Sequence, residues 1–268
     1  MPAKLKTILV SEQKGLLSIT LNRPEKRNAL DKAMIEELAE ALDKGLSPTV
    51  RSILITGNGG SFCAGADLNE FYELFDETPE VLSDHISDVA NLLHTRVIEQ
   101  IYELNKPVIA GINGVAAGAG MSLSLACDLR VCSQSSRFVM AYSHIGCTAD
   151  GGSTYFLPKL VGLSKAKELY LMNSPISAEY ALDIGMINQM VPDSSFDRHS
   201  LELGLRLSEG ATKAVGLTKS LFHGDLSNEL HDHLVRETEA IAAISKTKDF
   251  RNGVQAFIEK KKPWFQGL

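Results

Sequence analysis

A unit that occurs twice in this sequence constrains its fold more than any other feature. In each copy a short apolar strand runs into a turn of glycine and alanine, and a helix follows. The first turn is "SFCAGADL" (61–68), after "SILITG", and the second is "NGVAAGAGMSL" (113–123), after "PVIAGI". Free backbone N–H groups gather where a helix begins, and small residues let a ligand approach them closely. Two such turns can direct two N–H donors at one oxygen atom and so form an oxyanion hole. The alternative for either turn alone is tight packing of a helix against a strand.

The remaining pattern predicts an α/β body followed by a helical tail. Residues 7–24 read as two strands joined near Lys14 and Gly15, and residues 31–46 read as a helix capped by Asp31. A single long amphipathic helix is expected over residues 83–105, ended by Pro107. After about residue 164 every segment has helical spacing except "MINQMV" (186–191), which reads as a strand. We therefore predict a core over residues 1–190 and a helical region over residues 191–268.

Composition excludes several classes of function. The 268 residues carry a formal net charge of −6, which disfavours a nucleic-acid-binding protein because such proteins are basic. No apolar run is long enough for a membrane span, and the first residues lack the pattern of a secretory signal. The four cysteines form no C-x-x-C pair, so we expect buried thiols in a reducing, cytoplasmic compartment and no metal site.

Common catalytic fingerprints are also missing. "GNGGSF" and "GAGMSL" lack the third glycine of a dinucleotide-binding loop, so a Rossmann oxidoreductase is poorly supported. Neither turn continues into the G-K-[S/T] of a phosphate-binding loop, and "GMSLS" and "GGSTY" lack the G-x-S-x-G of a serine hydrolase.

Several motifs, in their order and spacing, resemble the crotonase superfamily, also called the enoyl-CoA hydratase/isomerase family. They are "LNRPEKRNAL" (21–30), "FCAGADL" (62–68), "INGVAAGAGMSLSLACDLRV" (112–131), "GGSTYFLPKLVG" (151–162) and "FRNGVQAFIEKKKP" (250–263). The resemblance implies the crotonase (ClpP/crotonase-like) fold, a spiral of β-β-α units followed by a C-terminal helical oligomerisation region. It also implies a homotrimer or a dimer of trimers that acts on an acyl-CoA thioester. Coenzyme A is then part of the substrate, and no other cofactor is implied.

The resemblance places the two oxyanion donors at the N–H groups of Ala66 and Ala119, in agreement with the two turns. The residues that it assigns to coenzyme A binding are Arg23, Lys26, Asn28, Ala29, Ala64, Phe257 and Lys260, the last two of which would act on a neighbouring subunit. Segment 69–90 is expected to set the preferred length of the acyl chain.

Asp150 is the only carboxylate in the stretch "HIGCTADGGSTYF" (144–156). The two glutamates of the hydratase branch would fall at Ser122 and Tyr142, neither of which can act as a carboxylate base. The sequence around Asp150 resembles that of the 1,2-epoxyphenylacetyl-CoA isomerase branch, in which an aspartate at this position is catalytic. We therefore expect Asp150 to shuttle a proton in a double-bond isomerase, with its pKa raised by apolar surroundings.

Other interpretations stay open. Asp150 can instead cap a helix beginning near Gly152, and Glu70 or Glu73 are the next candidates for a base. The alternative functions are an enoyl-CoA hydratase, an enzyme like 4-chlorobenzoyl-CoA dehalogenase with Asp150 as a nucleophile, and a scaffold that binds acyl-CoA without turnover.

Overall fold

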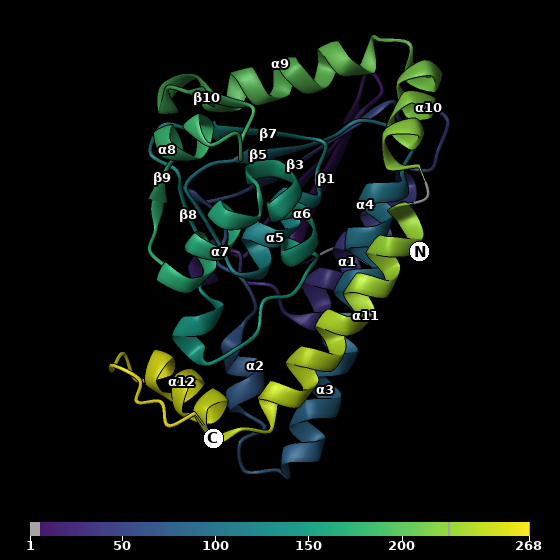
Figure 1. Cartoon of the computed structure of the whole chain (residues 1–268). Helices are drawn as coiled ribbons and strands as arrows, with labels where there is room; N and C mark the ends of the chain where they lie inside the picture. Colours follow the sequence, from purple (N-terminus) through teal and green to yellow (C-terminus); the bar gives the residue numbers. More distant parts are fainter. Residues whose placement is uncertain (1–5, 225, 268) are drawn as a thin grey trace.

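The structure is a computed structural model that describes residues 6–224 and 226–267. Its strands form two sheets (Figure 1). The larger sheet has the order β1 (Ile8–Gln13), β2 (Leu16–Leu21), β3 (Ser52–Gly57), β5 (Val108–Ile112), β7 (Leu129–Ser133) and β10 (Gln189–Val191). The smaller sheet has the order β4 (Ser61–Cys63), β6 (Val115–Ala117), β8 (Arg137–Val139) and β9 (Ile176–Ser177). Pairing is antiparallel between β1 and β2 and between β8 and β9, and parallel elsewhere.

Helices surround both sheets. The α-helices are α1 (Lys32–Lys44), α2 (Leu68–Tyr72), α3 (Pro79–Leu93), α4 (Glu99–Glu103), α5 (Ala119–Ala126), α6 (Ser153–Val161), α7 (Leu163–Met172), α8 (Ala178–Asp183), α9 (Phe196–Ser208), α10 (Thr212–His223), α11 (Leu226–Ser245) and α12 (Lys248–Ile258). Four short elements join them: η1 (Pro24–Lys26), η2 (His94–Ile98), η3 (Tyr142–Ile145) and η4 (Asp193–Ser195). Figure 1 shows α11 lying along α3 and α4, and α12 beside α2, so the last helices return to the body.

The β-β-α unit is the basis of the architecture. Strand β3 of the larger sheet is followed by β4 of the smaller sheet and then by α2, and β5, β6 and α5 repeat this order. The structure therefore places a second short strand in each segment that the sequence pattern indicated only as a turn. This repeated order confirms the expected spiral of β-β-α units.

Local predictions were confirmed at some elements and wrong at others. The Asp31 carboxylate accepts a hydrogen bond from the Met34 N–H at 2.8 Å, as expected for an N-cap. The helix expected over residues 83–105 begins earlier, at Pro79, and is interrupted by η2, a π-helical turn. Strand β9 was not expected, because two half-buried residues make no visible alternation.

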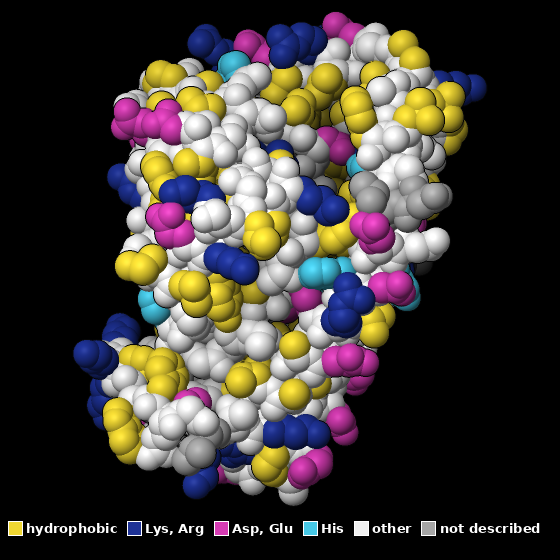
Figure 2. Space-filling model, in the orientation of Figure 1, with side chains coloured by type: hydrophobic (Ala, Val, Ile, Leu, Met, Phe, Trp, Pro, Cys, Tyr) yellow, Lys and Arg dark blue, Asp and Glu magenta, His cyan; other side chains and the backbone are white. Residues whose placement is uncertain are grey.

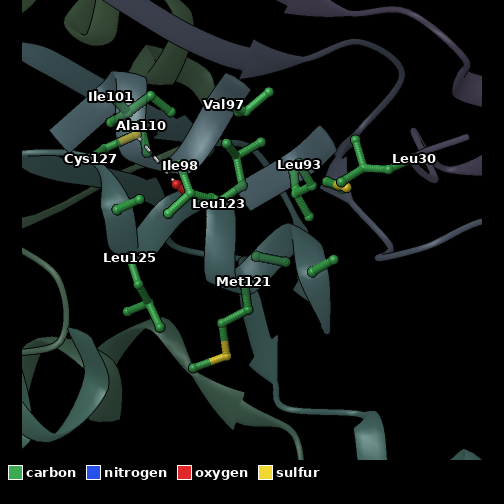
Figure 3. Close-up of a cluster of buried hydrophobic side chains, with 14 of the residues drawn as sticks. Leu30, Leu93, Val97, Ile98, Ile101, Ala110, Met121, Leu123, Leu125 and Cys127 are labelled. Carbon is green, nitrogen blue, oxygen red and sulfur yellow. Dashed lines mark hydrogen bonds between the residues drawn. The ribbon is translucent and has the colours of Figure 1, made fainter. Parts of the chain in front are cut away.

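The core is densely apolar around α5. All eight residues of α5 are buried, which explains why its sequence lacks a polar face. Figure 3 shows Ile98 and Ile101, from the chain that continues α3, converging with Leu123 and Cys127. The Cys127 thiol donates to the Leu123 carbonyl at 3.5 Å, and all four cysteines are free and buried, as predicted.

The surface carries charges of both signs. Figure 2 shows Lys and Arg side chains interspersed with Asp and Glu over the visible face. Within the described ranges, no helix combines the length and apolarity that crossing a membrane requires.

Candidate active site

A cavity of about 150 Å³ brings together the two glycine turns and Asp150. Its walls include both predicted oxyanion residues, Ala66 and Ala119. The apolar side chains that close it come from α2, α3, η3, α11 and α12, and include Phe71, Ile86, Val89, Ile145, Ile241 and Phe257. Among the described residues that line it, Asp150 is the one carboxylate. The cavity therefore combines a mostly apolar wall with a single carboxylate, as a site for a small apolar group requires.

The two turns lie against each other. A Cβ atom on Gly65 would lie 3.0 Å from the Ala117 carbonyl oxygen and 3.6 Å from the Ala119 nitrogen, so glycine permits this approach. Ala119 is the first residue of α5, where an N–H has no partner within the helix. Ala66 lies opposite Leu30 in an isolated β-bridge, but the hydrogen bonds of that bridge are made by the residues on either side of Ala66. The Gly65 carbonyl accepts from the Leu30 N–H, and the Asp67 N–H donates to the Leu30 carbonyl. Both alanine N–H groups thus belong to backbone that faces the cavity with Asp150.

Asp150 is held by a chain of hydroxyl groups. The Tyr142 hydroxyl lies 2.8 Å from Oδ1 of Asp150, and the Ser122 hydroxyl lies 2.7 Å from that of Tyr142. An ionised carboxylate only accepts hydrogen bonds, so Tyr142 donates to Asp150 and Ser122 donates to Tyr142. Burial raises the pKa of Tyr142 well above its usual range, which keeps this donor protonated. Ser122 and Tyr142, where the resemblance implied the glutamates of the hydratase branch, therefore orient the carboxylate through these hydrogen bonds.

The surroundings make Asp150 a stronger base than an exposed aspartate. It is 6% exposed, and this burial is the main reason why its pKa is raised. The negative charge of Glu237 also raises the pKa of Asp150, whereas the Tyr142 hydrogen bond lowers it. A positive charge on His94 would lower it as well. However, Nε2 of His94 accepts a hydrogen bond from the Gly151 N–H, and this contact requires the neutral ring.

Asp150 does not cap the following helix. Helix α6 begins at Ser153, and the Asp150 carboxylate is bonded to Tyr142 instead of to the first N–H groups of α6. Glu237 of α11 takes that place: it accepts from the Gly152 N–H at 2.7 Å and from the Thr154 N–H at 3.2 Å. The capping interpretation of Asp150 is therefore wrong, and its carboxylate is left to face the cavity.

Only some of the residues predicted to bind coenzyme A line the cavity. Ala64 and Phe257 line the cavity. The Arg23 guanidinium makes ion pairs with Asp67 at 2.8 Å and Asp31 at 3.1 Å, and it donates to the Ala29 carbonyl. These contacts explain why Arg23 is half-buried. Burial raises the pKa of Asp67, but the hydrogen bonds from Asn69 and Arg23 and the charge of Arg23 outweigh it, so the pKa is lowered.

Asn28 is fully buried and has a structural task. Its amide donates to the carbonyls of Asn58 and Ser61, and its oxygen accepts from the Arg23 N–H. Lys26 and Lys260 are exposed and lie outside the cavity wall. In the lower left of Figure 2, Lys and Arg side chains gather around α12, the helix that precedes Lys260.

The two glutamates considered as alternative bases do not line the cavity. Glu70 is half-buried and Glu73 is exposed, and neither side chain lines the wall, whereas His144 does. Sequence reasoning missed His94 and Glu237, whose spacing from Asp150 carries no local signal. Among the described residues, no cluster of three or more histidine, cysteine, aspartate or glutamate side chains is arranged to hold a metal ion.

The chain is similar to known proteins over nearly its whole length. A family model described as Enoyl-CoA hydratase/isomerase matches residues 11–267. A probable enoyl-CoA hydratase from Rhodobacter capsulatus is 38% identical over 97% of this chain and 98% of its own length. A 1,2-epoxyphenylacetyl-CoA isomerase from Escherichia coli is 35% identical with the same coverage. The crystal structure of an enoyl-CoA hydratase from Mycobacterium avium subsp. paratuberculosis superposes with a TM-score of 0.87 at 28% identity, covering 98% of this chain and 100% of that one.

Proposed function

This chain belongs to the enoyl-CoA hydratase/isomerase family, and we propose that within it the protein is an acyl-CoA double-bond isomerase that converts a 3-enoyl-CoA into the 2-enoyl-CoA. The observation that carries the proposal is the single buried carboxylate, Asp150, in the same cavity wall as the two oxyanion turns. Moving a double bond by one position needs one group that removes a proton and returns it.

The proposed reaction begins with the thioester oxygen against the N–H groups of Ala66 and Ala119. Asp150 removes a proton from C2, and the electron pair spreads over a dienolate whose oxygen the two donors stabilise. A donor of this kind is worth about 3 kcal/mol in the transition state. The protonated Asp150 then delivers the proton to C4, which leaves the double bond between C2 and C3. Because Tyr142 is bonded to Oδ1, Oδ2 is the atom that we assign to proton transfer.

The raised pKa of Asp150 suits both halves of this cycle. A carboxylate with an ordinary pKa is a weak base toward carbon acids, and proton transfer is most efficient when the pKa of the shuttle approaches the working pH. Burial supplies this shift without a second carboxylate in the cavity.

Hydration is the second candidate function, because the Rhodobacter capsulatus relative is named as a hydratase. Hydration requires a group that activates water as well as one that protonates C2. The residues at the two glutamate positions implied by the resemblance, Ser122 and Tyr142, instead form the hydroxyl chain that ends on Asp150. This arrangement supports isomerisation over hydration.

The acyl pocket favours a short or compact acyl group. Its volume of about 150 Å³ is bounded by Phe71, Ile86 and Val89 of segment 69–90. We assign coenzyme A to the mouth beside Ala64, with Arg23, Lys26, Asn28 and Ala29 shaping the approach and Phe257 and Lys260 acting on a neighbouring subunit. A homotrimer or a dimer of trimers fits this assignment, and exposed apolar residues on α10 (Leu217, Leu221 and Phe222) offer it a contact surface.

The test follows the absorbance of the conjugated thioester after the protein is mixed with a 3-enoyl-CoA. Wild-type protein is expected to produce it rapidly, and Asp150→Asn is expected to lose about 10²–10⁴-fold in rate while still binding acyl-CoA. Glu70→Gln is the matched control and is expected to keep the wild-type rate. A wild type that instead consumes a 2-enoyl-CoA by adding water, with no activity on the 3-enoyl-CoA, would show hydration and refute the proposal.

A further inference from the structure

The turn that carries Asp150 is held from outside by two buried side chains. Gly151 and Gly152 follow Asp150 with φ angles of +63° and +77°. The Gly151 N–H donates to Nε2 of His94 at 3.0 Å, and the Gly152 N–H donates to Oε2 of Glu237 at 2.7 Å. These contacts join segments that are 57 and 85 residues apart in the chain.

His94 is fixed in one tautomer by its two partners. Since Nε2 accepts from Gly151, the proton is on Nδ1, which donates to the Thr238 hydroxyl at 3.0 Å. His94 is 1% exposed and is the first residue of η2, the π-helical turn between α3 and α4. Such turns often occur at functional sites because they redirect one side chain out of the regular helix. Here the redirected residue reaches the backbone of the Asp150 turn.

Glu237 is a buried carboxylate with an uncommon set of partners. It is 5% exposed, and in the described part of the chain no lysine or arginine nitrogen lies within 4.0 Å of it; the one basic group in that range is His233, at 3.6 Å. Burial of an ionised carboxylate destabilises the folded protein unless hydrogen bonds compensate for the lost hydration. Its oxygens accept from the N–H groups of Gly152 and Thr154 and from the Thr154 hydroxyl, all at the beginning of α6. The partners of Glu237 are therefore the backbone that follows Asp150.

We propose that His94 and Glu237 are positioning residues that hold the turn of residues 150–152, and through it the Asp150 carboxylate, in the geometry required for proton transfer. This inference rests on the proposed function. Neither side chain lines this cavity, so neither contacts the substrate. Both act on Asp150 through the turn, and Glu237 acts in addition through its charge. Displacement of a reacting group by about 1 Å can reduce a rate by about 10²-fold. Loss of either anchor should therefore reduce kcat while substrate binding at the alanine turns is preserved.

Glu237→Gln tests the first anchor. It keeps the size of the side chain, but its NH₂ group faces an N–H donor, so one or more of the bonds to α6 is lost. We expect kcat to fall at least about tenfold with KM within about twofold of wild type. In hydrogen exchange, the amides of residues 151–154 should lose protection. Glu239→Gln, an exposed glutamate on the same helix, is the control and should change neither quantity.

A pair of substitutions at position 94 tests the second anchor. His94→Gln places an amide oxygen near the place of Nε2, whereas His94→Leu removes the acceptor. We expect the kcat of His94→Gln to be about tenfold higher than that of His94→Leu. The Gly151 amide should also be better protected from hydrogen exchange in His94→Gln than in His94→Leu. Melting temperatures of all variants show whether they fold, and comparison within the pair removes any general effect of a changed core residue.

The outcomes separate the two claims. A wild type without isomerase activity refutes the proposed function. An active wild type together with an unchanged kcat in Glu237→Gln and in His94→Leu refutes the positioning role alone. So does a loss of protection at residues 151–154 without a loss of kcat.

Discussion

The Tyr142 hydroxyl lies 2.8 Å from Oδ1 of Asp150, within a wall that is otherwise mostly apolar. The bond joins η3, the short helix that follows β8 of the smaller sheet, to the candidate catalytic turn. It stabilises the ionised form of Asp150 because the ionised carboxylate is the better acceptor. Burial acts in the opposite direction, so the pKa of Asp150 reflects a balance between the two.

Tyr142→Phe should shift this balance. Removing the hydroxyl removes an interaction that lowers the pKa of Asp150, so that pKa should rise further. Because isomerisation needs ionised Asp150, the acid limb of kcat/KM should move to higher pH and the rate at acidic pH should fall. Tyr170→Phe is the control, since its hydroxyl donates to the Cys147 carbonyl and not to Asp150. If the acid limb of kcat/KM in Tyr142→Phe stays in place or moves to lower pH, the assignment of Asp150 as the base that Tyr142 stabilises is contradicted.

Gly65→Ala should separate the two oxyanion turns. Gly65 has a φ of +100°, and an added Cβ would lie 3.0 Å from the Ala117 carbonyl oxygen. The turns would have to move apart, and a misplaced donor costs about 10²–10³-fold in kcat. Gly60→Ala provides the comparison because its φ is +78° but no atom lies within 4 Å of the added Cβ. We expect steady-state kinetics to show a large loss of kcat for Gly65→Ala only; equal losses would point to backbone strain alone.

Gly151→Ala should destabilise the protein more than Gly185→Ala does. Both positions have positive φ angles, so both substitutions strain the backbone by about 1 kcal/mol. At Gly151 the new Cβ would also lie 2.8 Å from Cβ of Ser122, whereas at Gly185 the nearest atom lies 3.8 Å away. Denaturant titration should therefore give a lower free energy of unfolding for Gly151→Ala, by about 1–3 kcal/mol relative to Gly185→Ala. Equal values would mean that Ser122 moves aside freely.

The sequence predicted the parts of the site that depend on local structure. Glycine and alanine at the ends of two strands indicated paired N–H donors, and Ala66 and Ala119 indeed line one cavity. Asp31 predicted the start of α1 because the hydrogen bond of an N-cap residue reaches an N–H only three residues later in the sequence. The position of Asp150 within its motif carried enough information to expect a buried base, and the structure buries it.

The contacts that hold the site could not be predicted in this way. Whether Asp150 caps α6 depends on what else reaches the beginning of that helix, and Glu237 arrives there from 85 residues away. The π-helical turn at His94 could not be predicted, because the apolar spacing of residues 83–105 also fits one continuous α-helix. Arg23 shows the same limit, because only the folded chain reveals its ion pairs with Asp31 and Asp67.

Asp150→Asn should stabilise the protein at neutral and alkaline pH. Burial raises the pKa of Asp150 in the folded protein above the ordinary value of 3.8, so the folded state keeps this proton to higher pH than the unfolded chain does. Between the two pKa values the folded state binds more protons, and stability therefore falls as pH rises through that window. Above it, wild-type protein bears the full penalty of a buried charge. An asparagine avoids this penalty, and its amide oxygen can still accept from Tyr142.

Melting temperatures measured at several pH values check this expectation. The melting temperature of Asp150→Asn should exceed that of wild type at about pH 8, and the difference should shrink as the pH is lowered and wild-type Asp150 becomes protonated. Asp232→Asn, which neutralises an exposed carboxylate on α11, should show no such trend. An Asp150→Asn protein that melts below wild type at about pH 8 would mean that the contacts of the ionised carboxylate outweigh its burial. Stabilisation accompanied by loss of isomerase activity would instead identify Asp150 as a charge retained for catalysis at the expense of stability.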